Sequence, residues 1–245
     1  MNATTTVLLL GATGRTGGRV PQQLLDRGVD VRAIVRSSTR LPAAVVGNPH
    51  LTVTEADLLS LTDAELQRHV AGCDAVISCL GHRIDLKGLF GPPRDLVTRA
   101  VARTCRAIEA QRPAEPVKFV LMNTVAVNRP GGLDTRRSGI ERGLLATMRA
   151  LVPPAKDNQT AADHLAERIG TGNDSVRWVV VRPDTLCEGD VTPYVLHEGI
   201  VATLAKPDDT NMANVAHFMC ELVEGAALFD TWAGKMPVIA NAVAR

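Results

Sequence analysis

The chain has 245 residues and a formal net charge of +1, with 45% apolar and 22% charged residues. This size and composition suit one globular α/β domain with a substantial core. A net charge near zero argues against a general electrostatic attraction to nucleic acid or anionic lipid. No apolar run reaches the roughly 20 residues that cross a bilayer, and the first residues lack a signal-peptide pattern. We therefore expect neither a nucleic-acid partner nor a membrane partner.

The cysteines are scattered and form no C-x-x-C pair; they are Cys73, Cys79, Cys105, Cys187 and Cys220. An odd number without a framework predicts reduced thiols, and hence a cytoplasmic protein. The histidines show no metal-ligand spacing such as HExxH, so we expect no metal site. The sequence leaves open whether the protein is a monomer or a dimer.

Apolar, β-branched runs alternate with helical patterns along the chain. Strands are predicted over residues 7–10, 31–35, 51–56, 75–80, 117–123 and 177–182. Helical periodicity is present in residues 21–28, 61–72, 95–111 and 153–170. Continuously apolar strands that alternate with helices indicate a parallel sheet covered on both faces. We expect a Rossmann-type doubly wound α/β fold in a single domain over 1–245, with a small C-terminal substrate lobe.

Three segments without regular periodicity follow predicted strands. They cover residues 82–95, 126–139 and 183–210. Doubly wound sheets bind their ligands at the carboxyl ends of the strands. These three segments are therefore expected to form the substrate side.

The stretch LLLGATGRTGGRV, residues 8–20, places Gly11, Gly14 and Gly17 between a predicted strand and a predicted helix. Glycines let the backbone turn sharply and approach a pyrophosphate, which the helix amides then stabilise. The simpler alternative is a tight strand–helix turn without a ligand. The expected dinucleotide contacts of this turn are Gly11, Ala12, Thr13, Gly14, Arg15, Thr16 and Gly17. Pro21 is awkward, because proline inside a helix removes a backbone hydrogen bond.

The end of the second predicted strand indicates which dinucleotide binds. An NAD site usually has Asp or Glu about 20 residues past the glycines, to bind the ribose hydroxyls. This chain has Arg36 there, followed by Ser37 and Ser38. A guanidinium pairs with a 2′-phosphate, and Arg15 and Arg40 could assist it. The sequence therefore favours NADP(H), although a solvated basic loop would look the same.

The chain resembles the atypical short-chain dehydrogenases/reductases. Within them it resembles a group that includes biliverdin reductase B-type flavin reductases and NmrA-like regulators. The resemblance is carried by GATGRTGG (11–18), IVR (34–36), EADL (55–58), DAVISCLG (74–81), FVLMNT (119–124) and VVVRPDTL (179–186). NVAHFMCELV and GKMPVI near the C-terminus extend it over nearly the whole chain.

The resemblance implies a row of cofactor contacts along the carboxyl edge of the sheet. They are Asp57 and Leu58 at the adenine, Cys79, Leu80 and Gly81 beyond the fourth strand, Asn123 and Thr124 near the nicotinamide ribose, and the turn of Arg182, Pro183, Asp184 and Thr185 over the nicotinamide. Simpler alternatives exist for three positions. Asp57 could cap the next helix, Gly81 could be a turn glycine, and Arg182–Pro183 could merely end a strand.

The sequence departs from the family in its catalytic pair. The main short-chain dehydrogenases use Tyr-x-x-x-Lys on one helix, whereas the single tyrosine here, Tyr194, is followed by Glu198. Lys156, at the start of the corresponding helix, could bind the nicotinamide ribose in place of the family lysine or could be solvated. Asp157 beside it could be only the N-cap of that helix. The candidates for proton transfer are His82, Asp184 and His197.

Without the tyrosine, carbonyl chemistry loses a positioned acid, but hydride transfer to a conjugated acceptor needs less proton assistance. The sequence thus favours an NADP(H)-dependent reductase of a small-molecule flavin- or quinone-like substrate. The alternative is a non-catalytic NADP(H) sensor of the NmrA-like type. A third hypothesis, an epimerase or dehydratase of a nucleotide-linked sugar, ranks last because such enzymes also rely on the Tyr–Lys pair.

Overall fold

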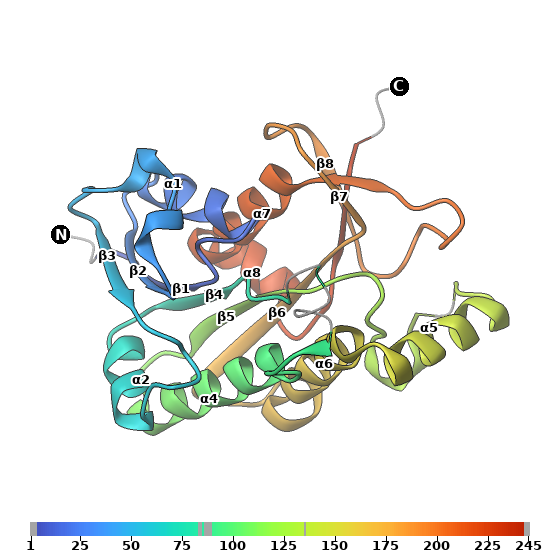
Figure 1. Ribbon diagram of the computed structural model, residues 1–245, viewed down its shortest axis with the longest axis horizontal. Coiled ribbons are helices and arrows are strands. Elements are labelled where there is room, and N and C mark those ends of the chain that lie inside the picture. The colour runs from blue at the N-terminus through green and yellow to red at the C-terminus, as the bar shows by residue number, and fades with distance from the viewer. Residues whose placement is uncertain (1–3, 83–84, 86–89, 135, 243–245) are drawn as a thin grey trace.

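The computed structural model describes residues 4–82, 85, 90–134 and 136–242. Its main sheet has the strand order β3-β2-β1-β4-β5-β6-β10-β8 (Figure 1). The strands are β1 (Thr6–Leu10), β2 (Asp30–Val35), β3 (Leu51–Glu55), β4 (Ala75–Ser78), β5 (Val117–Met122), β6 (Val176–Pro183), β8 (Tyr194–His197) and β10 (Val238–Asn241). Neighbouring strands are parallel except β8, which is antiparallel to β10. The chain reverses its direction across the sheet between β1 and β4, the switch point at which such folds bind ligands.

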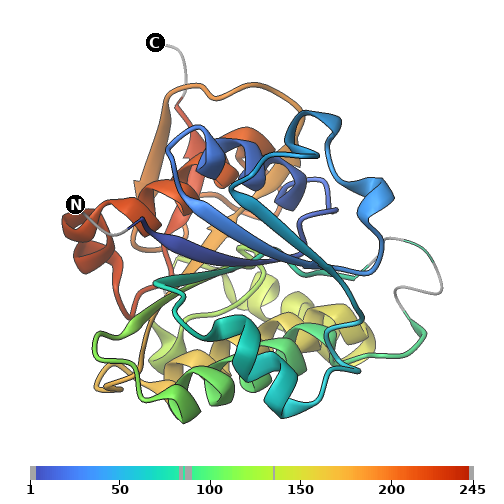
Figure 2. The same ribbon diagram turned by 90° about the vertical axis from the view of Figure 1, so that its left-hand side faces the viewer.

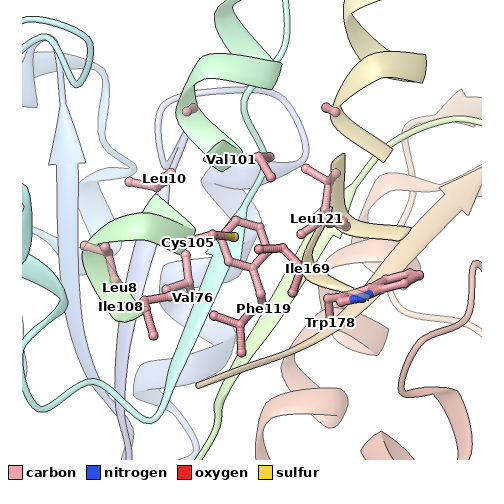
Figure 3. Packing of buried hydrophobic residues seen from close by; sticks show 14 of the residues in the cluster. Leu8, Leu10, Val76, Val101, Cys105, Ile108, Phe119, Leu121, Ile169 and Trp178 are labelled. Carbon is pink, nitrogen blue, oxygen red and sulfur yellow. The ribbon is translucent and has the colours of Figure 1, made fainter. Parts of the chain in front are cut away.

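Helices cover both faces of the sheet (Figures 1 and 2). One layer contains α1 (Val20–Leu25), α7 (Met212–Glu224) and α8 (Ala226–Trp232). The other contains α2 (Asp63–Val70), α4 (Leu96–Gln111) and α6 (Pro153–Asp163), which continues into the π-helical turn η5 (His164–Ile169). Alternate strand residues face the two layers, so that Leu8 packs towards α4 and Leu9 towards α7. Figure 3 shows the first of these cores, with Phe119 and Trp178 among its members.

The predicted Rossmann-type α/β fold is confirmed. Each of the six predicted strands is present, and each end lies within two residues of its predicted position. Pro21 is accommodated because the turn η1 (Gly17–Arg19) precedes α1 and places the proline in the first turn of that helix. An early position sacrifices no helical hydrogen bond, which removes the difficulty raised by the sequence.

Segment 183–210 is not all loop, contrary to the prediction. It contains β7 (Thr185–Cys187), β8 and the beginning of β9 (Asp209–Asn211), and β7 and β9 form a separate two-stranded sheet. These strands are short and partly exposed, so they lack the apolar runs by which the other strands were recognised. Pairing with segments distant in the sequence creates them.

The sequence interpretation also missed α5 (Gly139–Leu151), which projects beyond the end of the sheet in Figure 1. A capping box starts this helix: Glu141 N–H donates to Ser138 Oγ (3.2 Å), and Ser138 N–H donates to the Glu141 carboxylate (2.8 Å). The S-x-x-E pattern at residues 138–141 was therefore a usable signal. None of the helices in the described part of the chain has the length and apolar character needed to cross a membrane.

Candidate functional site

The glycine turn lies between β1 and α1, against the end of β4. Gly11 has a φ of +86°, and a Cβ there would lie 2.7 Å from the Cys79 carbonyl group. A Cβ on Gly17 would lie 2.2 Å from the Gly11 oxygen. These two glycines are therefore required by packing within the protein itself.

Gly14 has a different role from the other two glycines. It is exposed, and a Cβ there would meet only the Gly11 oxygen, at 3.3 Å. Its own N–H already donates to that oxygen (3.0 Å). Gly14 thus provides space at the tip of the turn, where Thr13 and Arg15 also reach the surface, whereas Ala12 and Thr16 are buried.

A glutamate from the substrate side lies over this turn. Glu188, just beyond β7, forms ion pairs with Arg15 (3.7 Å) and with Arg19. The Arg19 guanidinium also donates to the Arg15 carbonyl oxygen. The two side chains of Glu188 and Arg15 are mostly exposed, so these pairs are weak and open to exchange with another anion.

Arg36 follows β2 directly and is exposed. Its side chain has no hydrogen bond or ion pair with any other residue that the structure describes, so the guanidinium is free to bind a ligand. Nearby, Ser37 Oγ lies 2.9 Å from Thr39 Oγ1, and Arg40 donates to the Thr13 carbonyl (3.4 Å). Arg40 therefore connects this segment to the glycine turn.

Glu55, at the end of β3, is a residue that the sequence interpretation missed. Its carboxylate accepts a hydrogen bond from Ser38 N–H (2.5 Å), and hydrogen bonding with the side chain and the N–H of Ser38 lowers the pKa of Glu55. The bond holds segment 36–40 in place next to the end of β2. The EADL motif at 55–58 contained this residue, but no spacing rule indicated its partner.

Asp57 and Leu58 have different surroundings. Asp57 is exposed, and its Oδ1 accepts a hydrogen bond from Leu59 N–H (3.0 Å). It does not cap α2, because Thr62 does so together with Glu65. Leu58 is 7% exposed and belongs to the core beside α4. The expected adenine contacts of both residues stay predictions.

Beyond β4, Cys79 joins the glycine turn to the helical layer. Its N–H donates to the Leu10 carbonyl (2.8 Å), and its thiol lies 3.9 Å from Met219 Sδ. Burial raises the pKa of Cys79 to about 12, so its thiol stays neutral and unreactive. Leu80 packs against the core and Gly81 is exposed. Residues 11–17 and 79–81 therefore lie against each other at the switch point.

His82 and Asp157 form a pair that connects the segment after β4 to α6. His82 Nε2 lies 2.7 Å from Asp157 Oδ2, and the two side chains are 7% and 0% exposed. The Asp157 carboxylate also accepts hydrogen bonds from Val97 N–H (2.8 Å) and Thr98 N–H (2.9 Å) at the start of α4. Asp157 is thus not the N-cap of its own helix, as one hypothesis held, but binds the first turn of another.

The charge state of Asp157 follows from these contacts. Burial alone would raise the pKa of Asp157, but the bonds from His82, Thr98 and Val97 together lower it. An ionised carboxylate can only accept, so His82 must donate through Nε2, which leaves Nδ1 for another partner. No bond of His82 Nδ1 to another described residue is present.

Asn123 directly follows β5, and Lys156 lies in the first half of α6. Asn123 Nδ2 donates to the Asn158 carbonyl (2.9 Å), whereas its Oδ1 is buried without a hydrogen-bond partner among the described residues. Thr124 Oγ1 accepts from Ala126 N–H (3.3 Å). Lys156 is exposed, and its ammonium group has no bond to the described part of the chain.

Arg182 is fully buried at the end of β6. Its guanidinium donates to the Asp134 carboxylate (2.8 Å) and to the carbonyls of Met236 (2.8 Å) and Val127 (3.0 Å). Arg129 Nε donates to the same Asp134 (3.0 Å). Arg182 therefore joins β6 to segment 126–139 and is occupied within the protein.

Asp184 follows two residues later and is half-buried, between the buried Pro183 and the exposed Thr185. Its Oδ2 accepts from Asp208 N–H (3.2 Å). Burial, with a smaller contribution from the charge of Asp208, raises the pKa of Asp184. Asp184 is thus a carboxyl that holds its proton to a higher pH than usual.

The structure does not bring the three predicted proton donors together. His82 pairs with Asp157, Asp184 directly follows β6, and His197 lies on β8. In the described residues, no hydrogen bond or ion pair joins His82, Asp184 and His197 to one another. Lys156 is adjacent to Asp157 in the sequence. Within the described ranges, no cluster of three or more His, Cys, Asp or Glu side chains is suited to hold a metal ion.

The single tyrosine and the candidate proton donor His197 both lie on β8. The Tyr194 hydroxyl is 3.0 Å from His217 Nδ1 of α7, and the ring packs against Phe218. His197 pairs with Val238 in the β8–β10 ladder. The single tyrosine is therefore tied to α7 rather than to α6, where the family places its catalytic pair.

Comparison with known proteins agrees with this geometry. A family model described as NAD(P)H-binding matches residues 11–225, and the chain belongs to that family. The fold is similar to that of the oxidoreductase ylbE from Lactococcus lactis, with a TM-score of 0.68, 18% identity and coverage of 97% of this chain and 91% of that one. The chain is thus a member of the NAD(P)H-binding family, with the Rossmann-type fold that these structures share.

Two further structures share the fold. A candidate NADH-flavin reductase from Streptococcus pneumoniae aligns with a TM-score of 0.65 and 19% identity, over 97% of this chain and 100% of that one. A short-chain dehydrogenase/reductase from Veillonella parvula in complex with NADP aligns with a TM-score of 0.69 and 13% identity, over 98% and 95%. Such identities establish a shared fold only.

One relative has a higher identity over a shorter stretch. An uncharacterised chloroplastic protein of Arabidopsis thaliana is 31% identical over 125 residues, 50% of this chain. The match covers 42% of that protein. It therefore shows a related segment and not an equivalent whole protein.

Proposed function

We propose that this protein is an NADP(H)-dependent reductase that transfers hydride to a small conjugated acceptor such as a flavin or a quinone. The observation that carries the cofactor part is the pairing of an open glycine tip at Gly14 with the free guanidinium of Arg36. The first leaves room for a pyrophosphate, and the second suits a 2′-phosphate. A carboxylate at position 36 would repel that phosphate.

The residues at the switch point fit a dinucleotide. Gly11 and Gly17 hold the turn against Cys79, so the tip stays open, and Arg15 lies beside it. We assign Thr13, Arg15 and the turn backbone to the pyrophosphate, and Arg36 and Ser37 to the adenosine phosphate. When bound, NADPH supplies a hydride from its nicotinamide ring.

The His82–Asp157 pair provides a route for the proton. Protonated His82 donates from Nδ1 to the acceptor atom that gains charge, while Nε2–H stays bonded to Asp157. The ionised Asp157 stabilises the imidazolium before transfer and fixes the tautomer afterwards. Solvent then returns a proton to His82. One proton and one hydride are consumed for each reduced acceptor.

Other residues have binding roles in this proposal. Lys156 and the unpartnered oxygen of Asn123 would hold the nicotinamide ribose, because both lie at the end of β5 or on α6 beside it. Asp184 is a second candidate acid, since it retains its proton more readily than an exposed aspartate. Asp57 and Leu58 would contact the adenine, and residues 79–81 would line the cofactor beyond β4. A cytoplasmic location also stays a prediction.

The test is NADPH oxidation by the purified protein with a panel of flavins, quinones and enones. We expect turnover with at least one acceptor and a kcat reduced roughly 10²–10⁴-fold in His82→Gln. Asp157→Asn should lower kcat with a smaller change in KM. His50→Gln replaces an exposed histidine near β3 and serves as the matched control.

The competing hypothesis, a non-catalytic NADP(H) sensor, predicts tight dinucleotide binding without turnover of any acceptor. That result, with equal affinities for the oxidised and reduced forms, would contradict the proposed reductase. Turnover that survives unchanged in His82→Gln would instead remove only His82 from the mechanism.

A further inference from the structure

Three arginines gather on the substrate side, but only two of them have an anionic partner. Arg182 and Arg129 both bind the Asp134 carboxylate, at 2.8 Å and 3.0 Å. Arg137 forms no ion pair with any residue that the structure describes. Its Nη2 donates to the Val125 carbonyl oxygen. Asp134, Glu141 and Asp184 influence the charge of Arg137, but none of these carboxylates forms an ion pair with it in the described residues.

Arg137 is only 5% exposed, so water does not compensate for the missing partner. Its Nε and Nη1 atoms are buried and lack a hydrogen-bond partner among the described residues. Buried donors without acceptors are rare, because the group loses its hydration and gains nothing in return. A full positive charge increases that penalty. Such an arrangement is understandable where a ligand supplies the anion.

Arg137 lies at the edge of the sheet where a substrate is expected. The carbonyl that it binds belongs to Val125, just beyond β5, and Val125 N–H donates to the Pro183 carbonyl (3.1 Å). Asp184 follows Pro183, and its charge and that of Arg137 act on one another. Through Val125, Arg137 is thus held near the carboxyl ends of β5 and β6.

The same region is bounded by the two long segments after these strands. Glu141, at the start of α5, accepts a hydrogen bond from Leu204 N–H (2.8 Å), and Gly199 lies beside the Arg129 guanidinium. Segments 126–139 and 183–210 therefore meet around the arginine group. The position lies at the ends of β5 and β6, where a substrate is expected, and away from the dinucleotide turn, which follows β1.

We propose that Arg137 binds an anionic group, a carboxylate or a phosphate, on the hydride acceptor. The inference rests on the proposed function, because it names the substrate class of the same site: acidic conjugated acceptors and not neutral ones. Because Nε and Nη1 of Arg137 are buried, the side chains that cover them move aside when the anion enters. Its oxygens then satisfy donors that the protein leaves without partners.

The direct test measures anion binding without turnover. Benzoate and inorganic phosphate are titrated calorimetrically onto protein saturated with NADP⁺, so that the dinucleotide site is filled. We expect at least one anion to bind wild type and Arg136→Gln at least tenfold more tightly than Arg137→Gln. Arg136 is the adjacent exposed arginine and gives the matched control. Equal affinities in wild type and Arg137→Gln, or binding of neither anion, would overturn the proposal.

The two probes also distinguish the sources of the charge. Preference for benzoate indicates a carboxylate-bearing acceptor, and preference for phosphate a phosphorylated one. Arg137→Lys keeps the charge but loses the planar donor arrangement, so it should retain part of the affinity.

Steady-state kinetics provide a second readout. In wild type, riboflavin 5′-phosphate or another acidic acceptor should have a KM at least tenfold below that of its neutral counterpart, and Arg137→Gln should remove the difference. An unchanged KM ratio in Arg137→Gln counts against the proposal. Absence of turnover with every acceptor would contradict the reductase function, while the calorimetric titration would still decide the role of Arg137.

Thermal stability distinguishes anion binding by Arg137 from a purely structural role. If Arg137 serves an anion, replacing this buried cation, which lacks an ion-pair partner in the described residues, should leave the melting temperature of Arg137→Met equal to or above that of wild type. A fall of several degrees, with anion affinity unchanged in Arg137→Gln, would show that Arg137 serves the fold and would overturn the inference.

Discussion

Arginine performs opposite tasks at the two ends of the carboxyl edge. At the end of β2, Arg36 is exposed and free of protein partners in the described residues, and Arg15 is paired only with the exposed Glu188. At the end of β6, Arg182 is fully buried and bound to Asp134 and two carbonyls. The first arrangement leaves charge available for a ligand, and the second uses it to join elements of the fold.

The difference shows that local surroundings, and not residue type, decide what a guanidinium does. An exposed arginine loses little when its partner leaves, because water replaces the bond. A buried arginine without its partner leaves a charge in a low-dielectric interior. Substitutions at the two ends should therefore separate into effects on stability and effects on binding.

The largest expected effect is on stability, at Arg182. Arg182→Met should lower the free energy of unfolding by about 3–5 kcal/mol, because it removes the partner of a buried carboxylate. Urea unfolding measures this. Arg177→Met lies on the same strand but breaks only a partly exposed pair with Asp230, so it should cost at most about 1 kcal/mol. Equal losses in the two variants would contradict the distinction.

The same network predicts an acid dependence. Burial acts to raise the pKa of Asp134, but the bonds and charge of Arg182 and Arg129 lower it below its ordinary value of 3.8. The stability from this carboxylate is therefore complete above that value and is lost as the pH falls through the lower pKa of the folded protein. The stability difference between wild type and Arg182→Met should shrink in acid.

The next largest effect separates two glycines of the dinucleotide turn. Gly17→Ala would place a Cβ 2.2 Å from the Gly11 oxygen, so it should cost about 1–3 kcal/mol of stability and also weaken dinucleotide binding. Gly14→Ala should change stability by less than about 1 kcal/mol but still reduce dinucleotide affinity at least tenfold. Urea unfolding and fluorescence titration measure the two quantities. A Gly14→Ala variant that binds normally would show that no phosphate approaches this tip.

At Arg36 the expected effect is on cofactor choice. Arg36→Glu should weaken NADPH binding roughly tenfold to a hundredfold, since a charge-assisted hydrogen bond contributes about 1.5–3 kcal/mol. NADH affinity and stability should change little. Titration of both cofactors tests this, with Arg68→Glu on the exposed surface of α2 as control. Parallel losses for NADPH and NADH would exclude a 2′-phosphate contact.

The smallest effect is expected at Glu188, the anion that lies over the dinucleotide turn. Glu188→Gln frees Arg15 and Arg19, so both cofactors should bind up to about fivefold more tightly at low salt. The gain should disappear at high salt because exposed charges are screened. Weaker binding in the variant would mean that Glu188 positions these arginines for the ligand and does not compete with it.

Much of the fold was predictable because its signals are local. Strands β1 to β6 are recognisable in the sequence as apolar runs. The glycine motif directly follows β1, and a dinucleotide-binding turn occupies that position in this type of fold. The S-x-x-E box of α5 was equally local but was overlooked. In contrast, β8 and β10 are short segments of mixed composition without a clear strand pattern. They form strands because they pair with each other and because β10 also pairs with β6.

The candidate site was predictable to a smaller degree. The sequence indicated His82 as a candidate, but it did not indicate that Asp157, 75 residues away, is its partner. Asp157 was considered as the N-cap of its own helix, α6, whereas it binds the first turn of α4. The sequence interpretation placed Arg182 in a turn over the nicotinamide or at the end of a strand, whereas the side chain is buried within the protein, and it gave no role to Arg137. A side chain's burial and partners depend on which distant segments pack around it, and spacing rules do not contain that information.

By itself, the sequence determined the alternation of strands and helices up to β6, apart from α5, together with the glycine turn and a basic residue in place of the usual acid after the second strand. Those features follow from short-range periodicity and backbone sterics. Only the tertiary structure decided which arginines are free and which are bound, and which carboxylate holds His82. These properties arise when the carboxyl ends of distant strands meet, because hydration and charge pairing are set by neighbours in space.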